Sequence, residues 1–236
     1  ARGGADRIEL CSALPLGGLS PDEDLFCMVR ERVDIPVRVL LRPRAGDFLY
    51  DEDEFELLCC QAARFAGLGA DGIVIGMLNP DGTLDAERMS ALMTCGDGCG
   101  VTLHRAFDVC RDAHEALRTA KELGVDTILT SGQQARCADG APLLRELVSE
   151  SGEGLRILIG GGVNADVIRA LAPQTGADAF HLSAKAVVPS GMEFRREAVP
   201  MGAAGMNEFE LWRCDEGAVR AAREALDAVC TARKEN

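Results

Sequence analysis

The feature that most constrains this chain is a short apolar run that returns about every 25 to 35 residues. Each run follows a turn and precedes a stretch with the pattern of a helix, and its length fits a buried strand. The runs are Arg7–Cys11, Val37–Arg42, Gly72–Met77, Val101–Ala106, Thr127–Ser131, Arg156–Gly160 and Ala179–Ser183. Strands that alternate with helices predict a parallel α/β sheet. No linker divides the chain, so we expect one domain over residues 1–236.

Helix signals fill most of the spaces between the runs. Ser20–Glu23 has the form of a capping box with Pro at the first helical position, and predicts a helix to about Val33. Acidic residues at 51–54 suit the start of a helix that runs to Ala66. Further helices are expected at residues 112–123, 141–150, 164–172 and 216–233.

The number of strands indicates an eight-stranded (β/α)8 barrel, or TIM barrel, of which this chain contains seven strands. Residues 1–4 resemble the last turn of a helix, and no Met precedes them. We therefore predict a TIM barrel whose first strand and most of whose first helix are missing from this chain. An open, doubly wound sheet is the alternative. The barrel is favoured because no helix opens with a G-x-G-x-x-G sequence.

Composition excludes several classes of protein. The chain has 25 basic and 38 acidic residues, a net charge of −13, which argues against a nucleic-acid-binding protein. No apolar run approaches the roughly 20 residues that a membrane-spanning helix needs. The 10 cysteines are scattered through a chain large enough to have a core, so we expect reduced thiols and a cytoplasmic protein.

Residue alternation within the strands predicts a polar interior. Glu9, Arg42, His104 and His181 lie opposite the apolar residues of their runs, near the strand ends where barrel enzymes have their active sites. We predict a ligand site there, with Glu9, His104 and His181 as candidate catalytic groups and Glu9 paired with Arg42. The alternative is a structural Glu–Arg pair with two hydrogen-bonded histidines.

Two loops have the composition of an anion site. Gly160, Gly161 and Gly162 precede a helix start, and with Ser183 or Lys185 from the next strand they are expected to bind phosphate or a carboxylate. A tight turn is the alternative explanation. Arg44 follows Arg42 in the loop to Tyr50, and the two arginines are predicted to bind an anionic small molecule. Surface ion pairing is the alternative for this loop.

The cysteines form no zinc motif. Cys95 and Cys99 have neither the usual two-residue spacing nor a second ligand pair. Cys11 ends a strand on the side of Glu9, and its soft thiolate is a candidate ligand for Cu(I), although one thiolate alone is a poor copper site.

Segments along nearly the whole chain resemble the CutC copper homeostasis family, which is unrelated to the choline lyase of the same name. The segments are Arg7–Leu14, Arg42–Tyr50, His104–Asp108, Leu129–Gly132, Gly160–Gly162, Phe180–Ala184 and Gly191–Arg195. From these segments we add Arg105, Asp108 and Ser131 to the candidate ligand-binding residues.

The resemblance implies a cytoplasmic TIM barrel, a homodimer or homotetramer, that handles copper by binding Cu(I). Cys11 matches the second of two family cysteines, and the first belongs to the strand that we expect to be missing. The other interpretation is a barrel enzyme that acts on a small anionic metabolite, with His104 or Glu9 as the acid or base.

Overall fold

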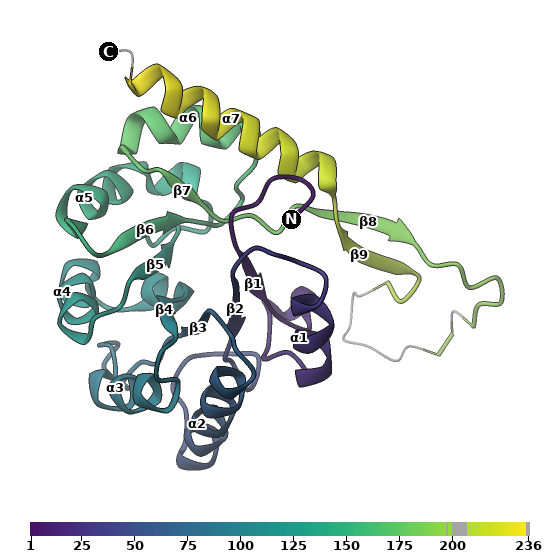
Figure 1. The fold of residues 1–236 in the computed structure, drawn as a ribbon, viewed down its shortest axis with the longest axis horizontal. Coiled ribbons are helices and arrows are strands. Elements are labelled where there is room, and N and C mark those ends of the chain that lie inside the picture. Colours follow the sequence, from purple (N-terminus) through teal and green to yellow (C-terminus); the bar gives the residue numbers. More distant parts are fainter. Residues whose placement is uncertain (197, 200–206, 235–236) are drawn as a thin grey trace.

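The computed structural model describes residues 1–196, 198–199 and 207–234. In this part of the chain, seven parallel strands form one curled sheet whose order in space, β1 to β7, is their order in sequence (Figure 1). They are β1 (Ile8–Leu10), β2 (Val37–Leu40), β3 (Gly72–Ile75), β4 (Gly100–Leu103), β5 (Thr127–Thr130), β6 (Arg156–Ile159) and β7 (Ala179–Phe180). All seven coincide with predicted strands.

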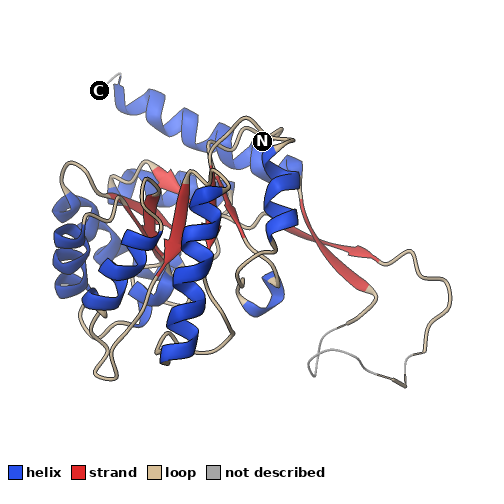
Figure 2. Cartoon of the chain, turned by 60° about the horizontal axis from the view of Figure 1, so that its bottom comes forward, coloured by secondary structure: helices blue, strands red, loops and turns tan. Residues whose placement is uncertain are grey.

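The helices lie around the outside of this sheet, as Figure 1 shows and Figure 2 repeats from another side. They are α1 (Glu23–Arg30), α2 (Glu52–Gly67), α3 (Ala86–Cys95), α4 (Ala113–Leu123), α5 (Ala141–Ser151), α6 (Ala165–Thr175) and α7 (Glu216–Lys234). A consecutive strand order with helices on the outer face defines a TIM-barrel type of fold. A doubly wound sheet would have helices on both faces.

Helix α3 is the one regular helix of the barrel that the sequence patterns above did not predict. It begins where the Asp85 side chain accepts a hydrogen bond from the Arg88 amide, and it ends at Gly96. Met89 and Leu92 pack into the core from its inner face. Turn-forming residues precede the helix, so the sequence pattern did not show where the loop ends and the helix begins.

The predicted alternation of side chains is confirmed. Val37, Val39 and Leu41 are at most 1 % exposed and pack in the core between sheet and helices. Arg38 points the other way, into the barrel, where it donates to both Asp126 carboxylate oxygens, at 2.6 and 3.0 Å. The barrel interior is therefore polar at the amino ends of its strands.

After β7 the chain leaves the barrel. It forms an antiparallel hairpin of β8 (Lys185–Pro189) and β9 (Glu210–Cys214), which projects from the body in Figures 1 and 2 before α7 returns to pack on α6. The predicted strand Ala179–Ser183 is correspondingly short, and Ala184 has a positive φ of 44° at the change of direction.

The position predicted for Lys185 is wrong. Instead of lying on the last barrel strand beside the glycine loop, it begins the hairpin, and its Nζ lies 3.9 Å from the centre of the Trp212 ring. We therefore remove Lys185 from the candidate anion site.

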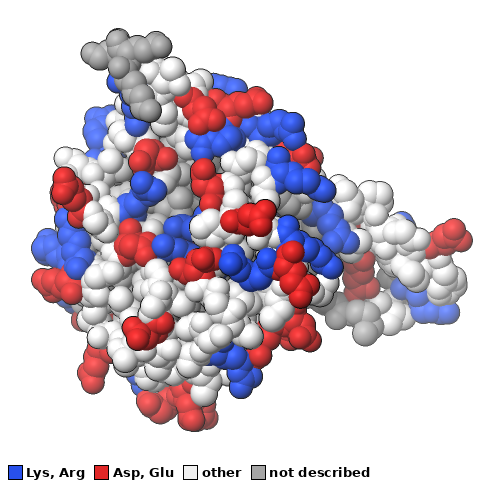
Figure 3. Space-filling model, viewed as in Figure 1, with Lys and Arg blue, Asp and Glu red and all other residues white. Residues whose placement is uncertain are grey.

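Basic and acidic side chains alternate over the face in Figure 3, without a large area of one sign. Among the helices of the described residues, none has the length and apolarity needed to cross a membrane.

Candidate functional site

A cavity of about 1460 Å³ occupies the inside of the curled sheet. The predicted site residues on its wall are Glu9, Cys11, Arg42, His104, Arg105, Gly161, His181 and Ser183. They come from strand ends or from the loops that follow, which is where barrel enzymes bind their substrates.

His104 is a buried hydrogen-bond donor that faces this cavity. Its Nδ1 accepts the backbone N–H of Ala106 at 3.1 Å, at the start of the 3-10 helix Arg105–Val109. Burial, together with the nearby charge of Arg42, lowers the pKa of His104 to about 3. The ring is therefore neutral with its hydrogen on Nε2, and this buried atom has no partner among the described residues.

Gly76 makes room for that ring. A Cβ at Gly76 would lie 2.6 Å from Cε1 and Nδ1 of His104, which is closer than real Cβ atoms approach. On another side, the Phe48 ring centre is 4.8 Å from the imidazole centre. The histidine is thus held in one orientation by its neighbours.

Arg42 is held by backbone carbonyls. Its guanidinium donates to the oxygens of Leu16, Gly18 and Gly46, and lies 5.1 Å from the centre of the Phe48 ring. The residue is only 9 % exposed, and its Nε has no partner in the described part of the chain.

The predicted ion pair between Glu9 and Arg42 is wrong. The Glu9 carboxylate instead binds Arg7 through Oε1, at 2.9 Å, and His181 Nδ1 through Oε2, at 3.3 Å. Arg7 is two residues from Glu9 on the same face of β1, and Arg42 is already occupied by three carbonyls. The Glu9 side chain is 8 % exposed, so its charge is compensated inside the barrel.

Asp108 and Ser131 support Arg105 rather than line the cavity. The Asp108 carboxylate accepts hydrogen bonds from Arg105 Nε at 2.6 Å, Thr130 Oγ1 at 2.6 Å, and both the amide and the hydroxyl of Ser131 at 3.0 Å. Arg105 in turn donates from Nη2 to Ser131 Oγ at 2.8 Å. The guanidinium is thereby fixed against the cavity wall.

The glycine loop lies between two arginines. Gly161 and Gly162 have φ values of +91° and +85°, a backbone conformation that residues with a side chain rarely adopt. A Cβ at Gly161 would lie 3.7 Å from Arg105 Cζ, and one at Gly162 would lie 3.5 Å from Arg136 Nε. Gly160 follows β6, and α6 begins shortly afterwards at Ala165. The Gly160 amide is used within the sheet, where it donates to Thr130 O at 2.9 Å, and two arginine side chains lie beside the other two glycines.

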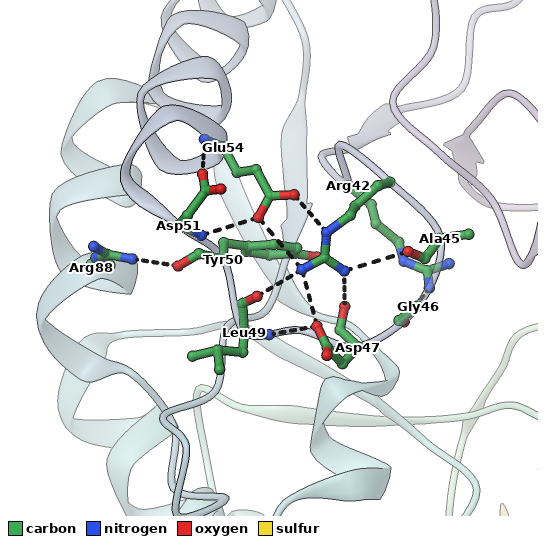
Figure 4. A network of polar contacts seen from close by, with 10 residues as sticks. Arg42, Ala45, Gly46, Asp47, Leu49, Tyr50, Asp51, Glu54 and Arg88 are labelled. Carbon is green, nitrogen blue, oxygen red and sulfur yellow. Dashed lines mark hydrogen bonds and ion pairs between the residues drawn. The ribbon is translucent and has the colours of Figure 1, made fainter.

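The structure places Arg44 away from the cavity. Its guanidinium binds Glu54 at 2.5 Å and Asp47 at 3.0 Å, and lies 5.4 Å from the Tyr50 ring centre. Figure 4 shows the loop folded around this network, with Asp51 and Glu54 of the α2 capping box beside it. For Arg44, ion pairing within the loop is thus the arrangement observed.

Cys11 is half-buried on the cavity wall. Burial, and then the Glu9 carboxylate, raise the pKa of its thiol. In the described residues no group of three or more His, Cys, Asp or Glu side chains could hold a metal ion. A single protonated thiol fits Cu(I) poorly.

Sequence reasoning missed three contributors to this site. Arg7 was not identified as the partner of Glu9, and Gly76 gave no signal because its role is to leave space. Arg136 lies in a loop without strand or helix periodicity. Only the fold brings it to the glycine loop.

Fold and site together define an α/β protein of the TIM-barrel type with a cavity inside its curled sheet, lined by charged and histidine side chains near the carboxyl ends of the strands. The model of the CutC family matches residues 1–186, and the chain belongs to this family.

Relatives from bacteria and from man support this membership. The chain is 46 % identical to the family protein CutC of Bacteroides fragilis (strain YCH46) over 201 residues, 85 % of this chain and 80 % of the relative. It is 40 % identical to the copper homeostasis protein cutC homolog of Homo sapiens over 220 residues, 93 % of this chain and 81 % of the relative.

Solved structures agree on the fold. The crystal structure of CutC from Streptococcus agalactiae matches with a TM-score of 0.70 and 28 % identity, over 75 % of this chain and 87 % of that one. Rubisco from Pyrococcus horikoshii OT3 matches with a TM-score of 0.59 at 14 % identity, over 98 % of this chain and 53 % of that one. The second likeness concerns the fold alone.

Proposed function

We propose that this protein binds a small anionic metabolite in the barrel cavity and acts on it as an enzyme. The observation that carries the proposal is the pair of buried donors on the cavity wall, Arg42 Nε and His104 Nε2, which lack partners among the described residues. A buried donor without an acceptor costs about 1–3 kcal/mol. Neighbouring atoms cover both nitrogens, so an oxygen-bearing ligand would supply the acceptors only after those neighbours move aside.

The charges around the cavity support an anionic ligand with a reacting group. Arg105 and Arg136 flank the glycine loop, which suits a phosphate or carboxylate group. Glu9 and His181 form a carboxylate–imidazole pair on the same cavity wall, a common arrangement for acid–base catalysis.

Millimolar inorganic phosphate should raise the melting temperature of the protein, because a ligand of the native state stabilises it by mass action, by about 2.7 kcal/mol at 100 times Kd. Gly161→Asp should abolish the rise, since it adds a negative charge beside Arg105. The measurement is a thermal melt with phosphate, with sulfate and with chloride at matched ionic strength.

Gly154→Asp is the matched control. Gly154 has the same φ of +91°, but a Cβ there would meet nothing within 4 Å. It should lower the melting temperature on its own account and keep the response to phosphate. An unchanged melting temperature of the parent protein in phosphate and in sulfate would refute anion binding at this loop.

A second candidate function is Cu(I) binding through Cys11. It is favoured by the position of this thiol on the cavity wall and by the name of the human relative, a copper homeostasis protein homolog. Because only one thiol is in place, we expect weak competition with a chromophoric Cu(I) chelator under reducing conditions, and none after Cys11→Ser.

Cys60→Ser is the control for that measurement, because Cys60 is exposed on α2 away from the cavity. It should leave the copper competition unchanged. Tight binding that is equal in the parent protein and in Cys11→Ser would show that Cys11 is not the ligand.

We also propose a reducing, cytoplasmic environment and self-association. All ten cysteines are free, which suits a reducing compartment. The projecting hairpin exposes Val187, Leu211 and Trp212, and apolar side chains of this kind are a common basis for contact between two copies of a chain.

A further inference from the structure

Building on the proposed function, we infer that the cavity catalyses removal of a proton from the carbon next to a carbonyl group. In this reaction His181 accepts the proton, and His104 donates a hydrogen bond from Nε2 to the carbonyl oxygen. Glu9 is a positioning residue, since it acts through His181. The substrate class is a small aldehyde, ketone or 2-oxo acid that carries a phosphate or carboxylate.

His104 is suited to the carbonyl oxygen because it can only donate there. Its Nδ1 is occupied as an acceptor by the Ala106 amide, so the hydrogen is on Nε2, which is unpartnered in the described structure. Neighbouring atoms cover Nε2, so the carbonyl oxygen reaches it only after they move aside. The low pKa agrees with a neutral ring. A neutral imidazole that stabilises negative charge on a carbonyl oxygen is an established device of enolising enzymes.

His181 is suited to accept the proton at Nε2 because its other ring nitrogen, Nδ1, faces the Glu9 carboxylate. Its Nδ1 lies 3.3 Å from Glu9 Oε2, and Arg7 fixes the second oxygen of Glu9. When Nδ1 carries the hydrogen on the side of this carboxylate, Nε2 carries the lone pair. The backbone N–H of His181 donates to Ile159 O at 2.7 Å, which anchors the residue at the strand end.

The reaction balances without an oxidant, a reductant or a second substrate. The electron pair of the C–H bond becomes the second bond between the two carbons, and the π pair of the carbonyl moves to its oxygen. The proton goes to His181 Nε2, and the imidazolium is stabilised by the Glu9 carboxylate. Return of a proton to the same carbon restores the carbonyl group and completes the exchange.

The anionic end of the substrate is assigned to Arg105 and the glycine loop. Arg105 is fixed by Asp108 and Ser131 beside Gly161, so a phosphate or carboxylate bound there would hold the substrate at one end. Such anchoring makes the proton transfer effectively intramolecular.

The experiment measures exchange of carbon-bound hydrogen for deuterium in D2O by proton NMR, with dihydroxyacetone phosphate and 2-oxobutanoate as probes. Binding of each probe is measured in parallel by calorimetry. The parent protein should exchange at least one probe faster than buffer. His181→Gln and His104→Gln should each lower this rate about 100-fold, and Glu9→Gln should lower it while probe binding persists.

His114→Gln is the matched control. His114 is the remaining histidine of the chain and lies half-exposed on α4, where it contacts Glu146 and Glu150. Its replacement should leave exchange unchanged. Gly76→Ala keeps every catalytic group but crowds the His104 ring, so its exchange should also fall. Thermal melts identify any variant that fails to fold. His181→Gln should disturb folding least, because the His181 side chain is half-exposed.

The outcomes separate this inference from the proposed function. A probe that binds but does not exchange overturns the inference and leaves anion binding intact. Exchange that survives in His181→Gln also overturns it, since the base is then another group. If neither probe binds and phosphate gives no thermal shift, the proposed function fails and the inference fails with it.

Discussion

Asp108→Asn should lower the free energy of unfolding by about 3 kcal/mol, one of the two largest effects that we expect from a single substitution in this protein. The side chain is 5 % exposed, and its carboxylate accepts hydrogen bonds from Arg105, Thr130 and Ser131. An amide at this position turns one acceptor into a donor that faces other donors. Urea denaturation measures the change.

The same variant should weaken the thermal response to phosphate, because Arg105 is no longer fixed beside the glycine loop. Thr130→Val removes one donor from the network and should cost about 1 kcal/mol, which gives the scale for a single hydrogen bond. A loss of less than 0.5 kcal/mol in Asp108→Asn, of the size of an ordinary surface substitution, would mean that the network does not hold this part of the barrel together.

Periodicity located the strands because each one is buried on the side that faces the helices. Val37, Val39 and Leu41 show the period of two that a strand imposes, and all three lie in the core. The hairpin of β8 and β9 is exposed or half-buried throughout, and none of its residues lies in the core to give such a signal. Sequence therefore predicted the barrel and missed the projection from it.

The candidate site was predictable in its position but not in its partners. Alternation placed Glu9, Arg42, His104 and His181 on the interior side, and all four line the cavity. The partner of Arg42 was not predictable, because backbone carbonyls of two loops bind it and carbonyls are present in every residue. Such contacts depend on how loops fold over the barrel mouth.

The pair of Arg38 and Asp126 should make the second large contribution, at the other end of the barrel, with a defined dependence on pH. Asp126 accepts from two nitrogens of Arg38, from Thr127 Oγ1 and from the Val101 amide. Burial alone would raise the pKa of Asp126, but the hydrogen bonds from Arg38 and Thr127 and the Arg38 charge lower it below the ordinary 3.8. The Asp126 side chain is 37 % exposed, so solvent screens its charge, and Asp126→Asn should cost about 1–2 kcal/mol at pH 7.

Because the folded-state pKa of Asp126 lies below the unfolded value, its contribution is complete above about pH 5 and declines as the pH falls through 3.8 toward the folded-state pKa. The difference in unfolding free energy between the parent protein and Asp126→Asn should accordingly shrink between pH 5 and pH 3. Urea denaturation across this range measures it. Asp97→Asn, which removes an exposed carboxylate before β4, is the control and should change the free energy by less than about 0.5 kcal/mol. A difference for Asp126→Asn that stays constant down to pH 3 would contradict the assignment, because the stabilisation would then not depend on the charge of Asp126.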